Sequence, residues 1–596
     1  MFTTRPELSG TFGMVASTHW LASQTGMAVL EAGGNAFDAA TAAGFVLQVV
    51  EPHLNGPAGE VPVVGWDARQ QEPFVICGQG TSPHAATPDR FRDLGLDLVP
   101  GTGLLPACVP GAFGGWLTML QRYGTLRLRE VLKYAIGYAR DGFPVVPRVS
   151  ATVETVASLF ADHWTSSAEV WLPGGRAPAP GRLFTNADLA HTYDRILGEA
   201  EAAGPDRDTQ IDAAREAFYA GFVAEAIARF VETPAMDDTG EPHAGLLGYD
   251  DLAGWRASVE EPLSLEYAGS TVLKAGPWTQ GPVFLQQLAL LRGFDLDALD
   301  PTGPEMVHLV TECAKLAFAD REAWYGDPDH VDVPMEALLS AAYNDERCKL
   351  VESSADCGPL RPGRPEGREP RLPSLLDVPR GPADEEQSAG LGEPTVRPTG
   401  LTRGDTCHVD AVDRWGNTVS ATPSGGWLQS SPAVPGLGFA LGTRGQMFWL
   451  EEGLPASLAP GKRPRTTLSP SLVLRDGRAW LAFGTPGGDQ QDQWSLLLFL
   501  RAMHSDLDLQ QAIDAPAWHT SHFPSSFYPR QRQPGRLHVE SRLGDDAIAD
   551  LRRRGHDVSV EDPWSLGRLS AVSREPDGLL RGAANPRGMQ GYAVGR

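Results

Sequence analysis

Thr406 is the residue whose setting in the sequence points most directly to chemistry. The segment before it, residues 352–404, is dense in Pro, Gly and charged residues, so it buries too little apolar surface to offset its ordering entropy. The segment after it, TCHVDAVD, alternates in part between polar and apolar residues, which predicts a strand over 406–413. An irregular stretch this long is commonly functional or disordered, and a plain interdomain linker is the alternative interpretation. The first interpretation allows an autoproteolytic cut between Asp405 and Thr406.

A cut before Thr406 would equip this residue to act as a nucleophile. A threonine hydroxyl is a poor nucleophile at neutral pH and needs a base. The α-amine of an N-terminal threonine, with an ordinary pKa of about 7.7–8.0, can take the hydroxyl proton and later protonate the leaving amine. No separate histidine is then required, and the sequence offers no convincing Ser/His/Asp arrangement. The predicted chemistry is cleavage of an amide, with the acyl group passed to water or to an amine.

A glycine-rich loop could supply the second part of such a site. The run GTPGGD, residues 484–489, leaves a predicted strand, and its glycines let backbone N–H groups approach a ligand closely. Acyl transfer needs donors of this kind aimed at the developing oxyanion. Most such loops are only turns, but together with Thr406 this one becomes a candidate oxyanion hole.

The elements that must position these residues divide the chain into a helical part and a β-rich part. Apolar periodicity, the Gly33-Gly34 stop and the potential cap Asn35 predict two helices within residues 19–50. Further helices are predicted over 113–142, 211–232 and 304–325, so the first two-thirds of the chain is expected to be mainly helical. After Thr406, strands are predicted on both sides of the turn 414–417, and on both sides of Asp476-Gly477 at 471–475 and 478–484.

Composition narrows the class of protein and of partner. The 596 residues carry a formal net charge of −25, and such a surface repels phosphate backbones, which argues against nucleic acid as a partner. Six scattered cysteines without a CxxC pair argue against a zinc site or a disulfide framework, and they favour a reducing compartment. The start has no signal-peptide pattern, and no apolar run reaches the roughly 18 residues of a membrane span. We therefore expect a cytoplasmic protein with no membrane partner.

A series of blocks along the chain resembles the gamma-glutamyltranspeptidase family of N-terminal-nucleophile hydrolases. The first part contains GMVASTHWLASQTGMAVLEAGGNAFDAATAAG, VVEPH, VPGAFGGW, FYAGFVAEAIARF and KLAFADREAWYGDP. The later part contains GDTCHVDAVDRWGNTVS, GKRPRTTLSPSLVLRDG, GTPGGDQQ and GAANPR. So many blocks in family order make a chance resemblance very improbable.

The resemblance covers nearly the whole chain and implies its architecture. It implies an α+β fold, a four-layer αββα sandwich. It also implies self-cleavage into a large subunit, 1–405, with a flexible Pro/Gly-rich tail at 352–404, and a small subunit, 406–596, that begins at the nucleophile. Together the two subunits would form one catalytic unit. The resemblance implies no metal ion and no organic cofactor.

Carried over residue by residue, the resemblance keeps the catalytic residues. Thr406 matches the nucleophile and new N-terminus, and Gly487 and Gly488 match the oxyanion-hole pair. Ser424 stands where a second threonine orients the nucleophile, so a hydroxyl is kept. An asparagine near the nucleophile is replaced by Gly426.

The residues that would hold the acyl group depart from the family pattern. Thr466 and Thr467 keep the hydroxyls of two serines that touch the substrate carboxylate. Gln79 stands where typical family members have an arginine that grips the α-carboxylate, and the family's acidic residue that binds the α-amine falls near Met447, so both charged anchors are lost. Arg444 stands nearby as a replacement cation. Because charge-assisted hydrogen bonds contribute about 1.5–3 kcal/mol each, losing both anchors disfavours a glutamyl zwitterion. The pattern resembles amidase-like relatives such as oxamate amidohydrolases and cephalosporin acylases.

We therefore expect an autoprocessing N-terminal-threonine amidohydrolase or acyltransferase. Its predicted substrate is a small amide with an anionic, oxamate-like acyl part held by Arg444, Thr466 and Thr467. One alternative is a true gamma-glutamyl transferase or glutathione hydrolase, and another is a non-catalytic family member kept as a structural or binding protein. The expected partners are the amide substrate and the two subunits of one precursor, and a homo-oligomer is left open.

Three further residues near these motifs have two interpretations each. His408 could tune the amine, but a hydrogen-bonded packing histidine is favoured. Cys407 should point to the opposite face of its strand and be a core thiol. Asp489 could touch the substrate or only shape the turn after the glycines.

Overall fold

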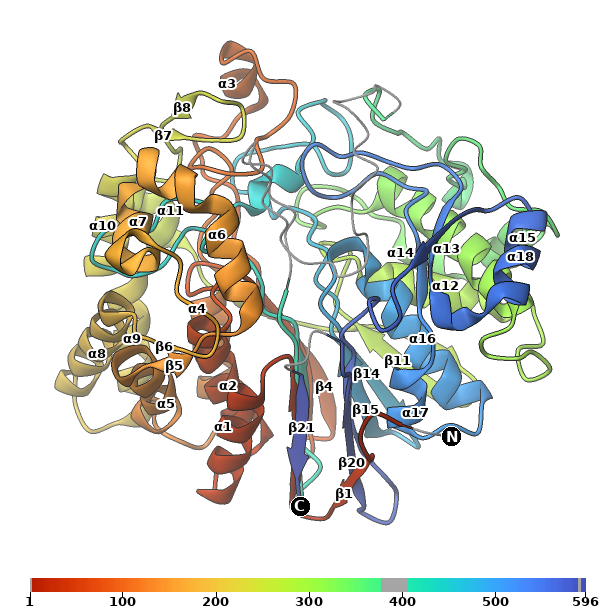
Figure 1. Cartoon of the computed structure of the whole chain (residues 1–596), viewed down its shortest axis with the longest axis horizontal. Helices are drawn as coiled ribbons and strands as arrows, with labels where there is room; N and C mark the ends of the chain where they lie inside the picture. Colours follow the sequence, from red (N-terminus) through yellow and green to blue (C-terminus); the bar gives the residue numbers. More distant parts are fainter. Residues whose placement is uncertain (1–2, 377–405, 588–590) are drawn as a thin grey trace.

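Two β-sheets lie face to face between layers of helices in the computed structural model of the protein (Figure 1). The structure describes residues 3–376, 406–587 and 591–596. Both sheets combine strands from before residue 377 with strands from after residue 405. The two predicted subunits are therefore interleaved, and the expected αββα sandwich is confirmed.

The first sheet carries the segment that follows Thr406 at its centre. Its strands are all antiparallel to their neighbours. Their order is β21 (Tyr592–Gly595), β2 (Gly13–Ser17), β12 (Val409–Asp413), β13 (Thr418–Ala421), β3 (Val61–Asp67), β4 (Glu72–Gly78) and β9 (Ser258–Glu260).

The second sheet carries the glycine-rich loop at the end of its central strand, and it is also antiparallel throughout. Its order is β1 (Leu8–Gly10), β20 (Leu580–Ala584), β19 (Ser570–Arg574), β15 (Arg478–Gly484), β14 (Ser471–Arg475), β11 (Ser270–Lys274) and β10 (Leu263–Tyr267). The predicted hairpin at Asp476-Gly477 joins β14 to β15 and is confirmed.

Alternation along the strands builds the layers. In β2, Met14 and Ala16 pack between the two sheets, whereas Val15 faces the outer helices. In β14, Leu472 packs between the sheets and Val473 faces the opposite helical layer. Because successive side chains of a strand point to opposite faces, each sheet is buried on both sides. The result is three apolar interiors, one between the sheets and one under each helical layer.

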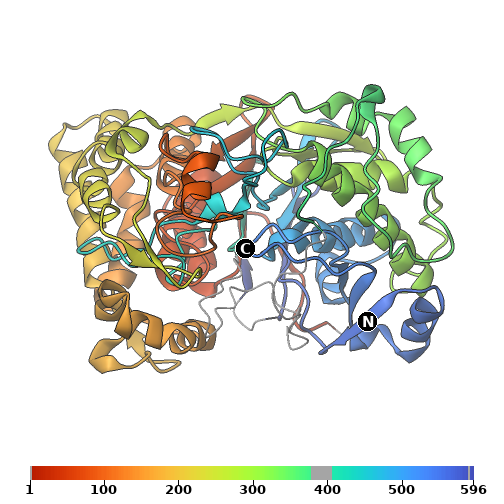
Figure 2. The same ribbon diagram turned by 90° about the horizontal axis from the view of Figure 1, so that it is seen from above.

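Two groups of helices cover the outer faces of the two sheets (Figures 1 and 2). The first sheet is covered by α1 (Trp20–Glu31), α2 (Ala36–Val50), α4 (Ala112–Tyr123), α5 (Leu128–Asp141), α8 (Ala187–Ala202), α9 (Arg207–Tyr219) and α10 (Phe222–Phe230). The second is covered by α12 (Gly281–Leu291), α13 (Pro304–Trp324), α16 (Gln491–His504), α17 (Leu509–Asp514) and α18 (Asp545–Arg553). Smaller elements include α3 (Pro88–Asp93), α6 (Pro147–Asp162), α7 (Thr165–Trp171), α11 (Tyr249–Gly254), α14 (Met335–Leu339), α15 (Ala341–Cys348), and the sheet of β16 (Trp518–Thr520), β17 (Arg536–Glu540) and β18 (Asp557–Glu561).

The start of α2 shows how local sequence fixes one of these helices. The Asn35 side chain accepts hydrogen bonds from the N–H groups of Phe37 and Asp38, each at 3.0 Å. Asp38 returns the bond by accepting from the N–H of Asn35 at 2.9 Å. This capping box satisfies donors that have no partner inside the helix. The predicted cap and the predicted pair of helices within 19–50 are confirmed.

The part of the chain before residue 377 also contains strands that the sequence analysis missed. The interleaved sheets take β1, β2, β3, β4, β9, β10 and β11 from it. In β3, every residue of VPVVGWD is buried, so the polar–apolar alternation that marks a half-buried strand is absent. The expectation that this part is mainly helical was therefore too simple.

The predicted tail at 352–404 is described only up to residue 376. That portion has irregular backbone apart from one 3₁₀ turn, Pro365–Gly367. It lies against α13, because the indole N–H of Trp324 donates to the carbonyl of Gly363 at 3.2 Å. Residues 377–405, including Asp405, lie outside the described residues. Within the described parts, no helix has the length and apolarity that a membrane span requires.

Candidate active site

Four strand ends meet at one end of the sandwich. Strand β12 begins shortly after Thr406, and its antiparallel partner β13 ends shortly before Ser424. In the second sheet, β14 begins shortly after Thr467, and its antiparallel partner β15 ends shortly before Gly487. Because the members of each pair run in opposite directions, the two ends in each sheet lie together.

His408 and Gly484 join the two sheets below these ends. A Cβ on Gly484 would lie 2.3 Å from Cε1 of His408, so the ring lies directly on the backbone of β15. Nδ1 of His408 is 2.9 Å from Oγ1 of Thr422, and Nε2 is 2.9 Å from Oδ1 of Asp410. Both ring nitrogens are thus used by neighbours on the same sheet, as the favoured packing interpretation predicted.

Thr406 and Ser424 form a direct hydroxyl pair. Oγ1 of Thr406 donates to Oγ of Ser424 at 3.2 Å, and the two residues form an isolated antiparallel bridge. Each residue is only 1% exposed. The predicted strand at 406–413 begins at Val409, so Thr406 itself lies on the irregular approach to the strand. Its hydroxyl is oriented by a hydroxyl from the next strand rather than by a histidine.

Arg444 reaches the same pair from a short 3₁₀ helix, Arg444–Met447. Its Nη2 donates to Oγ of Ser424 at 2.9 Å. Its Nε and Nη2 also bind Oε1 of Glu60, a residue that the sequence analysis missed. Nη1 contacts the sulfur of Met447 at 3.9 Å. Arg444 is therefore one half of a buried ion pair rather than a free cation.

The surroundings of this ion pair are apolar. The Arg444 guanidinium lies 5.4 Å from the centre of the Trp427 ring and 5.8 Å from that of Phe527. Trp427, Phe527 and Met447 form one buried cluster. Burial raises the pKa of Glu60, and the opposing charge of Arg444 limits this rise. Each charge of the pair thus depends on the other to remain in a dry environment.

The glycine loop follows β15 with two unusual backbone conformations. Gly487 has φ of 132° and Gly488 has φ of 53°, in the region that favours glycine. Within the described parts of the chain, the N–H groups of these two residues donate to no other protein group. Two such N–H groups at the end of a strand can serve an oxyanion.

Asp489 anchors this loop to the second helical layer. Its carboxylate pairs with Arg321 of α13 and accepts from the N–H of Ser526 at 2.8 Å. The side chain of Gln280 donates to the carbonyl of Gly488 at 3.4 Å. Burial acts to raise the pKa of Asp489, but Arg321 and Ser526 outweigh it and lower the pKa. These contacts give Asp489 the turn-shaping role, which was one of its two predicted interpretations.

Thr466 and Thr467 lie beside the N-terminus of α12 and differ in their hydroxyl partners. The N–H of Thr466 donates to the carbonyl of Trp278 at 2.9 Å, and its Oγ1 accepts from the N–H of Leu468 at 3.4 Å. The buried Oγ1 of Thr467 has no protein partner among the described residues. A buried hydroxyl without a partner is costly, so Thr467 is the better placed of the two to bind a ligand oxygen.

Gln79 lies at the same end of the first sheet. It follows β4, whose last residue, Gly78, is paired with Val61 next to Glu60. Its Nε2 donates to the carbonyl of Gly80 at 3.0 Å, whereas its Oε1 has no protein partner in the described parts. The side chain is buried, so this amide oxygen is a buried acceptor without a protein partner in the described parts.

Cys407 points away from this site, as its alternation with Thr406 predicted. Its Sγ donates to Oε2 of Glu51 at 3.1 Å and accepts from Nδ2 of Asn55 at 3.1 Å. Burial, followed by the charge of Glu51, raises the pKa of the thiol well above its ordinary value. The thiol is therefore a protonated core group, as expected.

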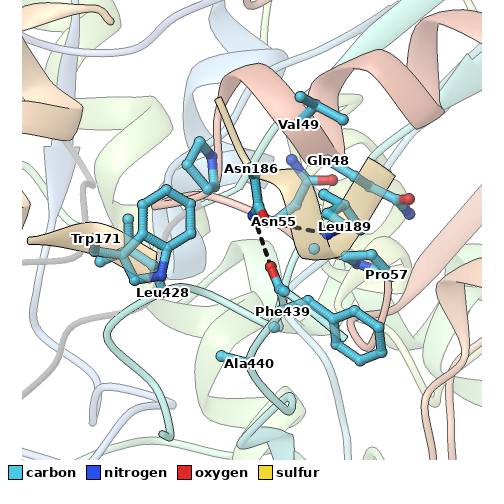
Figure 3. Close-up of a pocket in the computed structure, with 14 residues that line it drawn as sticks. Gln48, Val49, Asn55, Pro57, Trp171, Asn186, Leu189, Leu428, Phe439 and Ala440 are labelled. Atoms are coloured by element: carbon cyan, nitrogen blue, oxygen red, sulfur yellow. Dashed lines mark hydrogen bonds between the residues drawn. The ribbon is translucent and has the colours of Figure 1, made fainter. Parts of the chain in front are cut away.

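A small cavity is lined in part by Gly426, and Figure 3 shows the residues around it. It is also lined by Gln48 and Asn55, and Asn186 closes it by donating to the carbonyl of Gly438 at 2.8 Å. Its volume of about 10 Å³ is close to the least that one water needs. The buried Nε2 of Gln48 and Oδ1 of Asn55 have no protein partner among the described residues. The cavity is too small for an acyl group.

One cluster of metal-type side chains lies elsewhere, on α13 and before β18. The ligand atoms of His308, Glu312 and His556 lie within 4.8 Å of one another. Nδ1 of His308 is 2.8 Å from Nε2 of His556, and Nε2 of His308 is 2.8 Å from the carbonyl of Glu352. Glu312 pairs with Lys315 at 2.6 Å. The hydrogen bonds of the two histidines and the ion pair of Glu312 account for these contacts, so the cluster needs no ion to satisfy it.

Comparison with protein families gives one match that spans nearly the whole chain. The model of the gamma-glutamyltranspeptidase family matches residues 22–595. The Acylase ACY 1 proenzyme of Pseudomonas sp. (strain SE83) is 31% identical over 589 residues, which are 97% of this chain and 92% of that protein. The Glutathione hydrolase-like YwrD proenzyme of Bacillus subtilis (strain 168) is 30% identical over 98% of this chain and 99% of that protein. The Oxamate amidohydrolase proenzyme of Klebsiella pneumoniae subsp. pneumoniae is 32% identical over 98% of both.

Solved structures share the architecture along the whole chain. The structure of LmbA2991T421A is 58% identical, covers 100% of both chains and has a TM-score of 0.95. The cephalosporin acylase from Bacillus halodurans is 27% identical, covers 100% of this chain and 97% of its own, and has a TM-score of 0.81. The named relatives therefore include acylases, an amidohydrolase and a glutathione hydrolase-like protein.

Proposed function

Because the chain belongs to the gamma-glutamyltranspeptidase family and is an amide hydrolase or acyltransferase made as a cleaved precursor, we propose that Thr406 is its nucleophile and new N-terminus. The observation that carries this proposal is the 3.2 Å hydrogen bond from Oγ1 of Thr406 to Oγ of Ser424. It holds a buried hydroxyl directly at the predicted scission point. The non-catalytic alternative is excluded by the hydrolase and acylase relatives along the whole chain.

Self-cleavage follows from this position. The hydroxyl of Thr406 attacks the carbonyl carbon of Asp405, the peptide C–N bond breaks, and the acyl group moves to oxygen as an ester while the amine is freed. Water then hydrolyses the ester, which leaves a carboxylate on Asp405 and an N-terminal Thr406. Ser424 supports the attack because it fixes the direction of the hydroxyl.

The same groups then act on the substrate. The freed α-amine takes the proton of Oγ1 as the hydroxyl attacks the amide carbonyl, and it returns the proton to the leaving amine. The N–H groups of Gly487 and Gly488, which have no protein acceptor in the described parts, stabilise the oxyanion. Water or an acceptor amine removes the acyl group from Thr406.

The substrate we propose is a small amide with an anionic, oxamate-like acyl part. Oγ1 of Thr467, with Thr466 beside it, offers a hydroxyl to the carboxylate, and Nη1 of Arg444 offers the donor that Glu60 does not occupy. Gln79 and Met447 offer no carboxylate that could pair with the α-ammonium group of a γ-glutamyl substrate. The carboxylate of Glu60 is already bound to Arg444.

A panel of amides tests this substrate class. The purified, processed enzyme is assayed with oxamate, other anionic amides without an amino group, γ-glutamyl-p-nitroanilide and glutathione. We expect the anionic amides to have the higher kcat/KM. Higher kcat/KM for glutathione would instead support the rival gamma-glutamyl hydrolase. The cytoplasmic location and the homo-oligomer stay predictions.

A further inference from the structure

Glu60 and Ser424 are cross-strand neighbours on the side of Ser424 away from Thr406. The N–H of Glu60 donates to the carbonyl of Ser424 at 2.8 Å, and the N–H of Ser424 donates to the carbonyl of Glu60 at 3.0 Å. On its other side Ser424 forms the bridge with Thr406. The backbone thus places Glu60, Ser424 and Thr406 in one row across the sheet.

Arg444 closes this row through side chains. Its guanidinium binds the Glu60 carboxylate and donates to Oγ of Ser424 at 2.9 Å, and the same oxygen accepts from Oγ1 of Thr406 at 3.2 Å. A continuous series of contacts therefore runs from the Glu60 carboxylate to the nucleophile. Ser424 has two donors pointing at it, and one of them is aimed by Glu60.

Burial makes Arg444 dependent on Glu60. The side chains of Arg444 and Glu60 are 2% and 4% exposed, and the neighbours on the other side are Trp427, Phe527 and Met447. A guanidinium with only aromatic and thioether neighbours would be poorly solvated, so without a carboxylate it would turn toward water. The contact with Glu60 fixes the orientation of the planar Arg444 guanidinium and also balances its charge, because Nε and Nη2 both bind one carboxylate oxygen.

We propose that Glu60 is a positioning residue for the nucleophile, acting through Arg444 and Ser424. It holds Arg444 so that Nη2 keeps Oγ of Ser424 directed at Thr406, and so that only Nη1 remains for the acyl group. This inference rests on the proposed function of Thr406. It adds a residue outside the nucleophile, the hydroxyl pair and the glycine loop.

The first test separates positioning from substrate binding. Glu60→Gln keeps the size of the side chain and removes its charge, so the charge-assisted bonds to Arg444 weaken. We expect kcat and the rate of self-cleavage, which involves no substrate, to fall about 10-fold or more. The matched control is Glu540→Gln, which removes the charge from another buried ion pair, with Arg587 at 2.8 Å, and should change neither quantity.

The second test asks whether Glu60 acts through Ser424. In a Ser424→Ala background, Glu60→Gln should cause no further loss beyond about twofold, because the group it positions is gone. In a Ser424→Thr background, which keeps the hydroxyl, it should cause the full loss. Equal further losses in both backgrounds would overturn the proposal, and so would a Glu60→Gln enzyme with unchanged kcat and self-cleavage. If Ser424→Ala is not cleaved, the Ser424→Thr background alone decides. The full loss caused there by Glu60→Gln supports the proposal, and the absence of this loss overturns it.

Two outcomes keep this inference distinct from the proposed function. If wild-type protein is neither cleaved before Thr406 nor active on amides, the proposed function fails whatever Glu60 does. If wild type is cleaved and active while Glu60→Gln behaves like wild type, only the inference fails. Where Glu60→Gln does not yield folded protein, Glu60→Asp takes its place, because it keeps the charge and withdraws the carboxylate from Arg444. Its kcat and its rate of self-cleavage should then fall, and wild-type values of both would contradict the inference.

Discussion

Gly487 packs directly on the indole ring of Trp494, so that a Cβ at this position would lie 2.3 Å from Cζ3 of the ring. Trp494 belongs to α16 and is 1% exposed, so it has no space into which to retreat. The φ of 132° at Gly487 independently favours glycine. Packing against Trp494 therefore fixes the backbone conformation at the proposed oxyanion hole.

The neighbouring glycine allows a direct test of the oxyanion hole. A β-branched side chain at Gly488, where φ is 53°, would force the loop to change and redirect its N–H groups. We expect Gly488→Val to fold and to lower turnover about 10²–10³-fold, the loss typical for one oxyanion donor. Gly578→Val is the control, because Gly578 also has positive φ, at 93°, but faces open space. Near-normal turnover by a processed Gly488→Val enzyme would mean that this loop is only a turn.

The two threonines before β14 should differ in their effect on substrate binding. Thr467→Val removes a buried hydroxyl that has no protein partner in the described parts, whereas Thr466→Val removes one that accepts from Leu468. If the carboxylate of the substrate binds Thr467, its loss should raise KM about 10-fold or more, since hydrogen bonds to charged groups contribute about 1.5–3 kcal/mol. The change for Thr466→Val should be smaller. Steady-state kinetics with the best anionic amide measure both, and the reverse order would refute the assignment.

Arg444→Ala should affect two kinetic constants rather than one. It removes Nη1 from the acyl group, which raises KM, and it removes the donor that holds Ser424, which lowers kcat. It also leaves the buried Glu60 carboxylate unpaired, so the variant should lose about 3–5 kcal/mol of stability. Arg444→Lys keeps the charge without the fork and should retain more stability than kcat. An Arg444→Ala enzyme with a raised KM and an unchanged kcat would show that the contact with Ser424 has no catalytic role.

His556, which lies just before β18 and contacts His308 of α13, predicts a pH dependence of stability. Burial, together with Lys315, His308 and Arg554, lowers the pKa of His556 to about 3. An unfolded chain binds this proton below about pH 6.5, while the folded chain does not, so stability falls as pH drops from about 6.5 toward 3. The slope from this one residue approaches about 1.4 kcal/mol per pH unit.

His556→Gln should remove that part of the slope. Urea unfolding midpoints measured between pH 7 and pH 5 are expected to fall less steeply for this variant than for wild type. His163→Gln, at an exposed position, is the matched control and should follow wild type. If His556→Gln and wild type lose stability in parallel, the histidine is not held neutral in the fold.

Local sequence patterns predicted the elements that carry the site. They did not predict all the contacts between these elements that complete the site. The cap at Asn35, the hairpin at Asp476-Gly477 and the alternation of Thr406 and Cys407 depend on residues close in sequence, and each could be predicted. Glu60 and Arg444 are 384 residues apart, and Arg321 and Asp489 are 168 apart. No periodicity or turn signal relates residues at such distances, so these ion pairs emerge only from the packed sheets.

Buried strands were missed for a related reason. All seven residues of β3 are buried, because sheets on one side and helices on the other cover both of its faces. Such a strand lacks the alternation by which strands are recognised. Glu60 immediately precedes this strand, so missing β3 also concealed a residue of the site.

The central claim, that Thr406 becomes the N-terminus and acts as nucleophile, is tested most directly by the N-terminal sequence and mass of the small subunit. Purified wild-type protein and Thr406→Ala are compared on a denaturing gel, and the smaller band is sequenced. We predict two bands for wild type, with a small subunit that begins TCHVDAVD, and one inactive, uncleaved band for Thr406→Ala. A small subunit that begins elsewhere, or an active wild-type protein that remains a single chain, would contradict the account.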